Sequence, residues 1–298
     1  MKINKDPGLL TGAGLIIAII SGIMLPQASF VKFAIPWLLG LMLFFSFLTT
    51  DLSFKGFLQL RLILFPVIVW IILPPIVFFV TKNFEISLRT GLFIVSIAPP
   101  ALGAPVIVSI IGGDKKSILS HTVLFNLLSP FAYAILFSVW FSSLSGVHIP
   151  VIKIFFKVAT IIFLPFVISL IIRKIPKFKD RLSSISSFLS PLLLILVVFS
   201  ACASASYKIR EIPFISILKT GILVFIICIV LYFTGFITAK RLKTRLSFAI
   251  GMGQKNTSLA VWISMLSSGP LASVPAIIYI ICHHTITALI ILLQNKEN

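Results

Sequence analysis

GMGQKNTS, residues 251–258, is a polar segment that interrupts an otherwise apolar stretch from Leu246 to Leu266. A lysine at membrane depth costs about 2.5 to 3.5 kcal/mol on insertion scales, so Lys255 is by default a functional candidate. None of the seven acidic residues falls in the middle of an apolar stretch, which leaves Lys255 without an intramembrane carboxylate partner. A fixed positive charge at this depth favours an anion site over a carboxylate-based sodium site.

The composition places the whole chain in a membrane. Of its 298 residues, 59% are hydrophobic and only 11% are charged, unlike an ordinary soluble domain. Apolar runs of about 20 residues, the length that one transmembrane helix needs, recur along the sequence. These runs are continuous, whereas membrane β-strands alternate in polarity. We therefore predict an all-α polytopic membrane protein.

The net charge of +18 does not indicate a nucleic-acid partner, because the basic residues lie in short loops between apolar runs. Sixteen Lys and Arg residues lie on the side of the N-terminus and eight on the other. The positive-inside rule then puts both termini in the cytoplasm, in a protein that we expect in a bacterial inner membrane. The basic segment 240–245 is expected to contact anionic membrane lipids.

Ten spans are predicted, at residues 9–25, 33–50, 59–81, 87–112, 117–142, 150–172, 187–206, 214–238, 246–267 and 271–293. The fourth contains APPALGAP, residues 98–105, and the ninth contains residues 251–258. Proline and glycine loosen helices, so both spans should unwind at mid-depth. Interrupted spans at matching places in two halves indicate a transporter built from repeats. Because five spans are an odd number, repeats 1–145 and 146–298 must be inverted. The alternative is two independent proline kinks.

Several motifs resemble those of the bile acid:sodium symporter family. They are the proline-led span 35–44 with its acidic turn at 48–54, Gly112-Gly113-Asp114 with Leu119-Ser120, Leu127-Leu128-Ser129-Pro130, and Gly253, Asn256, Leu259 and Ala260. The resemblance implies a panel of spans 1, 2, 6 and 7. It also implies a core of spans 3, 4, 5, 8, 9 and 10, in which broken helices 4 and 9 cross.

The chain departs from that family at its sodium ligands. A Ser-Asn pair of the family corresponds to Ala104 and Pro105, a Glu to Gly251, a Gln to Lys255, and a hydroxyl of the fifth span to Asn126. Most of these replacements offer no side-chain oxygen, so sodium is not expected to bind there. The Lys255 ammonium can fill the space that sodium occupies elsewhere and balance an anionic substrate. Since desolvation disfavours a charged amine, Lys255 is also a candidate carrier of a coupling proton.

The expected substrate and ion site comprises Pro99, Pro100, Gly103, Ala104, Pro105, Asn126, Gly251, Gly253, Gln254, Lys255, Asn256, Thr257 and Ser258. Asn126 has the alternative role of an interhelical hydrogen bond. His283 and His284 are candidates for a proton relay, although neighbours on a helix diverge by about 100° and at most one should face the core. Each is alternatively a donor to a neighbouring backbone. His121 is expected at a helix start near the interface, and His148 in a loop.

These features predict a secondary transporter that moves a small or amphipathic organic anion by alternating access. The alternatives are an arsenite-type permease, weakened because no cysteine lies at the fourth-span break, and a non-transporting receptor or scaffold. No catalytic motif points to an enzyme. No cofactor is expected, and Cys202, Cys228 and Cys282 lack the spacing of a metal site. The sequence carries no signal for the oligomeric state.

Overall fold

The computed structural model describes residues 7–50, 60–142 and 150–297. The described chain is helical throughout, and its one β-type pairing is an isolated bridge between Pro100 and Lys255. The predicted repeat boundary at 145/146, the turn residues 51–54, His148, and Lys2, Lys5 and Lys55 lie outside the described residues.

The helices follow the predicted spans closely. In chain order they are α1 (Pro7–Met24), η1 (Pro26–Ala34), α2 (Ile35–Thr49), α3 (Leu60–Pro66), η2 (Val67–Ile72), α4 (Leu73–Val80), α5 (Ile86–Ile97), α6 (Ala104–Ile110), α7 (Lys115–Phe137), η3 (Ser138–Ser142), α8 (Val151–Ile172), α9 (Pro176–Glu211), α10 (Phe214–Ile237), α11 (Leu242–Gly253), α12 (Thr257–Ser268), η4 (Pro270–Ser273) and α13 (Val274–Glu297).

Seven of the described helical segments are long and apolar enough to cross a membrane, and the apolar helices at Thr11–Met24, Ile86–Ile97 and Thr257–Ser268 are shorter. Two of these short helices are parts of the spans predicted to be interrupted. The all-α membrane character is confirmed, whereas the crossing of the membrane by ten spans stays a prediction. The largest difference is α9, which extends well beyond the predicted span 187–206 at both ends.

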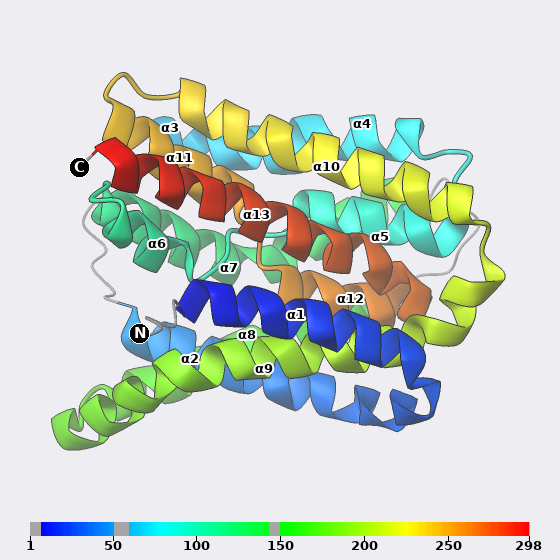
Figure 1. The fold of residues 1–298 in the computed structure, drawn as a ribbon, viewed down its shortest axis with the longest axis horizontal. Coiled ribbons are helices and arrows are strands. Elements are labelled where there is room, and N and C mark those ends of the chain that lie inside the picture. The colour runs from blue at the N-terminus through cyan, green and yellow to red at the C-terminus, as the bar shows by residue number, and fades with distance from the viewer. Residues whose placement is uncertain (1–6, 51–59, 143–149, 298) are drawn as a thin grey trace.

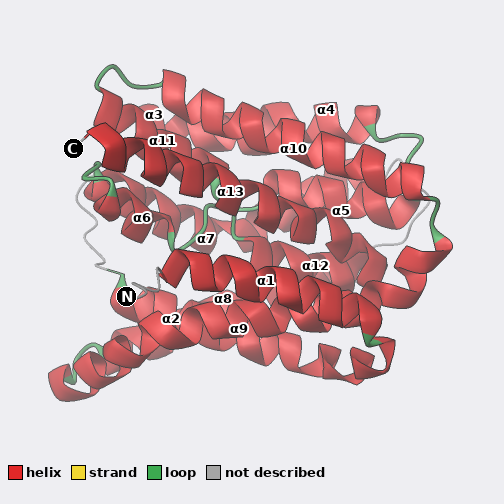
Figure 2. Cartoon of the chain, in the orientation of Figure 1, coloured by secondary structure: helices red, strands yellow, loops and turns green. Residues whose placement is uncertain are grey.

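The helices pack in two groups (Figure 1). In the first, α9 lies against α1 and α2, and α2 lies against α8. In the second, α10 packs on α11 and α13, α5 packs on α12 and α13, and α6 packs on α7. Figure 2 shows that loops are confined to the two ends of the bundle and to the interruptions in its interior. Both chain ends lie at the same end of the bundle.

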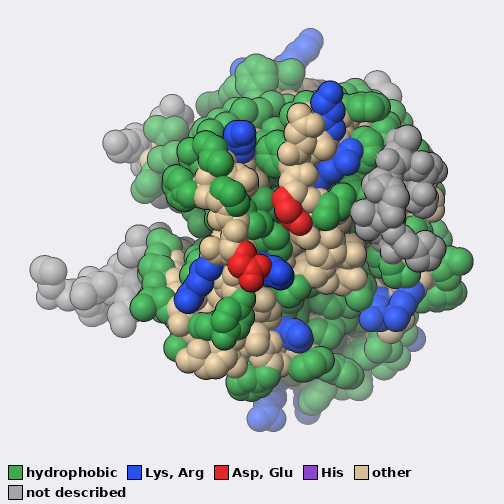
Figure 3. Space-filling view, turned by 90° about the vertical axis from the view of Figure 1, so that its right-hand side faces the viewer, with side chains coloured by type: hydrophobic (Ala, Val, Ile, Leu, Met, Phe, Trp, Pro, Cys, Tyr) green, Lys and Arg blue, Asp and Glu red, His purple; other side chains and the backbone are tan. Residues whose placement is uncertain are grey.

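The outer surface carries many large apolar side chains. Trp37, Phe33, Phe214 and Ile152 are each more than seven-tenths exposed, which a soluble protein would avoid over so wide an area. The end of the bundle drawn in Figure 3 shows Lys, Arg, Asp and Glu side chains among apolar surface. An apolar flank with charged ends is the distribution that a lipid bilayer requires.

Candidate functional site

The two interrupted spans meet inside the bundle. The Ala101 amide donates to the Gln254 carbonyl at 2.9 Å, and the Asn256 amide donates to the Pro99 carbonyl at 2.7 Å. These bonds flank the bridge between Pro100 and Lys255. Each unwound segment therefore supplies partners for the polar backbone of the other, as buried non-helical backbone requires in a membrane. The predicted juxtaposition of the two breaks is present.

The local sequence explains why both helices stop here. Pro99 and Pro100 have no amide hydrogen, so α5 ends at Ile97 and α6 starts only at Ala104. In the other span, α11 ends at Gly253, where an added Cβ would lie 2.1 Å from a ring carbon of Tyr232. Only glycine lets this helix end approach the tyrosine so closely.

Lys255 lies at the centre of the crossing and is 1% exposed. Its Nζ donates to the carbonyl oxygen of Ala98 at 2.9 Å and lies 4.8 Å from the centroid of the Phe65 ring. Ala98 is the C-cap residue of α5, where unpaired carbonyls carry partial negative charge. Among the described residues, no carboxylate pairs with this ammonium. The ion pair present in the described part of the chain joins Lys208 to Glu211 at the surface. A helix end and an aromatic face thus balance the charge.

Asn126 joins the two breaks to α7. Its Nδ2 donates to the carbonyls of Pro100 and Thr122, both at 2.8 Å, and its Oδ1 accepts from Asn256 Nδ2 at 2.7 Å. Asn256 is also the N-cap of α12, because its Oδ1 accepts from the Leu259 amide at 3.2 Å. Asn126 is fully buried and makes the interhelical hydrogen bonds of its alternative role, while its part in binding a substrate or ion stays a prediction.

A second polar chain leaves the crossing from Gln254. The Gln254 Nε2 donates to Thr287 Oγ1 at 2.9 Å, and Thr287 Oγ1 lies 2.7 Å from the Tyr232 hydroxyl. That hydroxyl donates to the backbone carbonyl of His283 at 3.1 Å. The His283 ring is buried and neither of its nitrogens has a hydrogen-bond partner, whereas His284 is half-buried. Of the two histidines, His283 therefore faces the core.

The remaining predicted site residues have different surroundings. Ala104 and Pro105 are buried at the start of α6, while Gly103 is exposed with no atom near its missing side chain. Gly251 packs against Ile118 on α7. Thr257 and Ser258 are buried in the first turn of α12. The crossing thus contains the predicted ninth-span residues and the prolines, and not Gly103.

Sequence reasoning missed several partners of the crossing. Trp70 Nε1 donates to the Ile97 carbonyl at 3.0 Å, and the Tyr279 hydroxyl donates to the Gly253 carbonyl at 2.8 Å. The ends of α5 and α11 are therefore both capped by an aromatic donor. The available signal was the presence of Trp and Tyr in mid-span rather than at a membrane interface.

His121 was expected at a helix start near the interface, and the structure places it in the second turn of α7 with its side chain inside the protein. Its ring is buried, 4.8 Å from the ring centroid of Phe65, and its Nδ1 has no hydrogen-bond partner. Phe65 also lies beneath the Lys255 ammonium. Asp114 caps α7, which begins at Lys115, and the His121 ring packs against Phe65 and Phe125 on the inward face of that helix.

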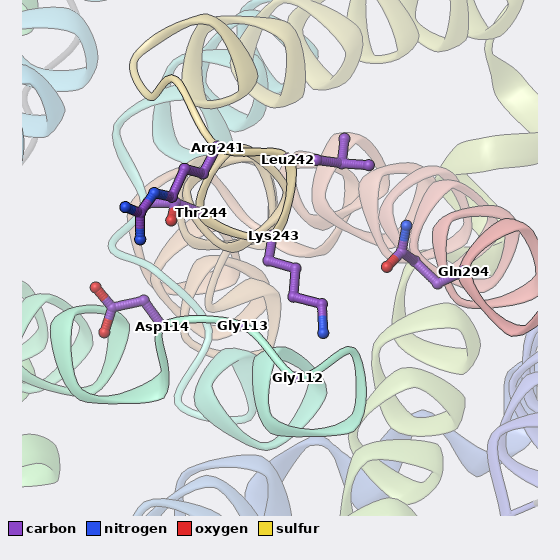
Figure 4. Close-up of a pocket in the computed structure, with 8 residues that line it drawn as sticks. All are labelled: Gly112, Gly113, Asp114, Arg241, Leu242, Lys243, Thr244 and Gln294. Carbon is purple, nitrogen blue, oxygen red and sulfur yellow. The ribbon is translucent and has the colours of Figure 1, made fainter. Parts of the chain in front are cut away.

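A pocket of about 480 Å³ opens at the end of the bundle, away from the crossing. It is lined by Gly112, Gly113, Asp114, Arg241, Leu242, Lys243, Thr244 and Gln294. Lys243 extends between the Gly112 turn and Gln294 of α13, while Arg241 and Asp114 lie to one side (Figure 4). Gly112 has a φ of +63°, a conformation that favours glycine. None of the residues predicted for the site lies in this pocket.

These features define an integral membrane protein with two interrupted helices paired in its interior, a design typical of secondary transporters. The SBF-like CPA transporter family matches residues 13–293, and the chain belongs to this family. The resemblance to the bile acid:sodium symporters is thereby confirmed, and a transporter role follows from the membership. No curated protein matches the chain.

Proposed function

We propose that the chain is a secondary transporter for a small or amphipathic organic anion, that it works by alternating access, and that it needs no sodium. The observation that carries this proposal is the Lys255 ammonium, bonded to the Ala98 carbonyl where the two interrupted helices meet. At the crossing, the Lys255 ammonium supplies the positive charge that a bound sodium ion would supply in the related family.

The residues at the family's sodium-ligand positions argue against sodium. Sodium requires several hard oxygen ligands, and the side chains of Ala104, Pro105 and Gly251 have none. The Asn126 amide oxygen is committed to Asn256 at 2.7 Å. The Ala98 carbonyl at the end of α5 already has a cationic partner. These contacts support a transporter in which the Lys255 side chain takes the place of a bound cation.

The packing supports the proposed architecture of two inverted repeats, 1–145 and 146–298. The helices α1, α2, α8 and α9 pack together, as expected for a panel of spans 1, 2, 6 and 7. The interrupted spans α5–α6 and α11–α12 pair in antiparallel fashion across the bridge, as inverted repeats would place them. In this architecture all ten spans cross the membrane, with α5 and α6 forming one of them and α11 and α12 another.

The two ends of the crossing differ in a way that supports alternating access. At one end, α12 packs against α2, α8 and α9 of the panel. At the other, α6 packs mainly on α7 and α11, and its residues Val106 and Ile110 are 61% and 62% exposed. The panel therefore covers the α12 end of the crossing more closely than the α6 end, and we infer that the α6 end is the one that opens. That end holds both chain termini and is the cytoplasmic side by the positive-inside rule, in a bacterial inner membrane.

The anionic character of the substrate rests on charge. Lys255 brings a cation to the middle of the bundle, and no described carboxylate pairs with it. A carrier that presents this charge is electrostatically suited to an anion. Proton coupling is part of the proposal, with Lys255 and the unpartnered His283 as the candidate carriers.

The test is thermal stabilisation of the purified protein in detergent by a panel of organic anions, with and without sodium, for the wild type and Lys255→Gln. A ligand that binds the folded state raises the apparent melting temperature by mass action. We expect an anion to stabilise the wild type without sodium, and Lys255→Gln to lose the shift. The matched control is Lys208→Gln, which removes a surface charge.

Stabilisation of the wild type by sodium itself would overturn sodium independence. If an anion still raised the melting temperature of Lys255→Gln, Lys255 would not be part of the anion-binding site. Stabilisation by arsenite alone would favour the permease. Complete absence of flux for every stabilising anion in proteoliposomes would favour a receptor or scaffold on the same fold.

A further inference from the structure

The α8–α9 hairpin projects from the end of the bundle that holds both chain termini (Figure 1). The helix α9 has 36 residues, which corresponds to a length of about 54 Å at 1.5 Å per residue. The hydrocarbon core of a bilayer is only about 30 Å thick. The predicted span 187–206 accounts for that thickness, so residues 176–186 lie beyond the apolar part of the helix. The first turns of α9 therefore belong at the headgroup level or outside it.

The hairpin has a fixed base. The Arg173 guanidinium follows α8 and donates to the carbonyls of Phe47 and Thr50 at the end of α2. Ser186 on α9 is buried, and its hydroxyl donates to the Ser183 carbonyl at 2.7 Å. The Ser186 bond lies within α9, so it is the Arg173 bonds that tie the base of the hairpin to the end of α2.

One face of the projecting helix combines cations with an exposed aromatic ring. Lys177, Arg181 and Phe188 are separated by four and seven residues, which places them on the same side of the helix. Both cations are exposed, and Phe188 is 73% exposed. Lys174 in the turn before α9 adds a third exposed cation. The ring of Phe188 lies about 10 Å from Arg181 along the helix, on the side of the apolar span.

This spacing matches a phospholipid at the membrane boundary, where phosphate is outermost and acyl chain begins below it. We propose that Lys174, Lys177 and Arg181 bind the phosphate of an anionic phospholipid while Phe188 contacts its acyl chains. Basic side chains beside a transmembrane segment are attracted to an anionic membrane surface. The site thus prefers anionic headgroups to zwitterionic ones. It rests on the membrane insertion of the protein and is independent of the proposed transport activity.

The experiment compares phosphatidylglycerol and phosphatidylcholine with identical acyl chains as stabilisers of the detergent-solubilised full chain. The measured quantity is the apparent melting temperature. We expect phosphatidylglycerol to raise it more, and Lys177→Gln/Arg181→Gln to lose at least half of the difference between the lipids. The matched control is Lys115→Gln/Lys116→Gln, which removes two exposed cations from the same end of the bundle on α7. Phe188→Ser should weaken the stabilisation by both lipids.

Equal stabilisation by the two lipids would overturn the proposal. So would an equal loss in the α7 control, because the preference would then reflect overall charge. A shift reproduced by inorganic phosphate alone would assign the site to a soluble anion. Lipid stabilisation requires no transported substrate, so its absence would leave the proposed transport intact, and a lack of anion flux would leave the lipid site intact.

Discussion

The side-chain amides of Asn126 and Asn256 are joined by a 2.7 Å hydrogen bond that links α7 to the start of α12. Through its own Nδ2, Asn126 also holds the Pro100 carbonyl of the other interrupted span. A single side chain thus connects both breaks to an uninterrupted helix. This arrangement predicts that the geometry of the crossing depends on the asparagine pair.

We expect Asn126→Ala to lower the stability of the folded protein by about 1–3 kcal/mol, because it leaves buried polar groups of Pro100 and Asn256 unpaired. Asn256→Ala should have a similar effect. The double variant should cost clearly less than the sum of the two, since both remove the same hydrogen bond. Thermal or denaturant unfolding in detergent measures this, and strictly additive losses would mean that the pair does not interact.

Alanine substitutions of three glycines at the breaks should differ in their effect. Gly253→Ala should destabilise the protein strongly, since its Cβ would lie 2.1 Å from the Tyr232 ring. Gly251→Ala should be milder, because it meets the flexible end of Ile118 at 2.8 Å. Gly103→Ala meets nothing within 4 Å and serves as the neutral control. Melting temperatures that do not follow this order would contradict the packing around the crossing.

Cysteine accessibility should distinguish the two ends of the crossing. In a Cys282→Ser background, Val106→Cys and Ile110→Cys on α6 should react with a membrane-impermeant maleimide added from the cytoplasmic side. Ile263→Cys on α12 should stay unreactive, because Ile263 is fully buried. Inside-out vesicles and whole cells provide the two directions of access. Labelling of the α6 positions from the outer side would reverse the proposed orientation.

His283→Leu should leave stability unchanged or raise it, because neither ring nitrogen has a partner to lose and an unpaired polar group is costly to bury. If His283 carries a proton in the cycle, the same variant should flatten the dependence of anion flux on pH. The measurement pairs a melting curve with uptake at several pH values. His284→Leu is the matched control, and an unchanged pH profile in His283→Leu would exclude this role.

The sequence was sufficient to predict the helices and the two breaks, while the meeting of the breaks followed from the family resemblance. Proline pairs and glycines have local effects on the backbone, so Pro99, Pro100 and Gly253 could be placed without knowledge of tertiary structure. Lys255 could be singled out as a candidate because a charge in an apolar span is costly wherever it points. Its partners were not predictable, because a backbone carbonyl such as that of Ala98 has no sequence signature.

Other features could not be predicted from the sequence, because they depend on how the helices pack in three dimensions. Phe65 resembles any of the 28 phenylalanines, and only the fold places it beneath Lys255 and beside His121. The link from Gln254 to Tyr232 passes through Thr287, a residue that has no distinguishing feature in sequence. The extra turns of α9 were missed because a hydropathy pattern ends where polar residues begin, while a helix does not have to end there.

The contact of the Lys255 ammonium with the carbonyl at the end of α5 has a consequence for the conditions in which the protein can exist. An ion that is free to dissociate leaves its site when the surrounding solution is poor in that ion. The ammonium of Lys255 is part of the polypeptide, and its local concentration at the Ala98 carbonyl does not change with the medium. The contact between Lys255 and the end of α5 should therefore form in fresh water as it does in brine.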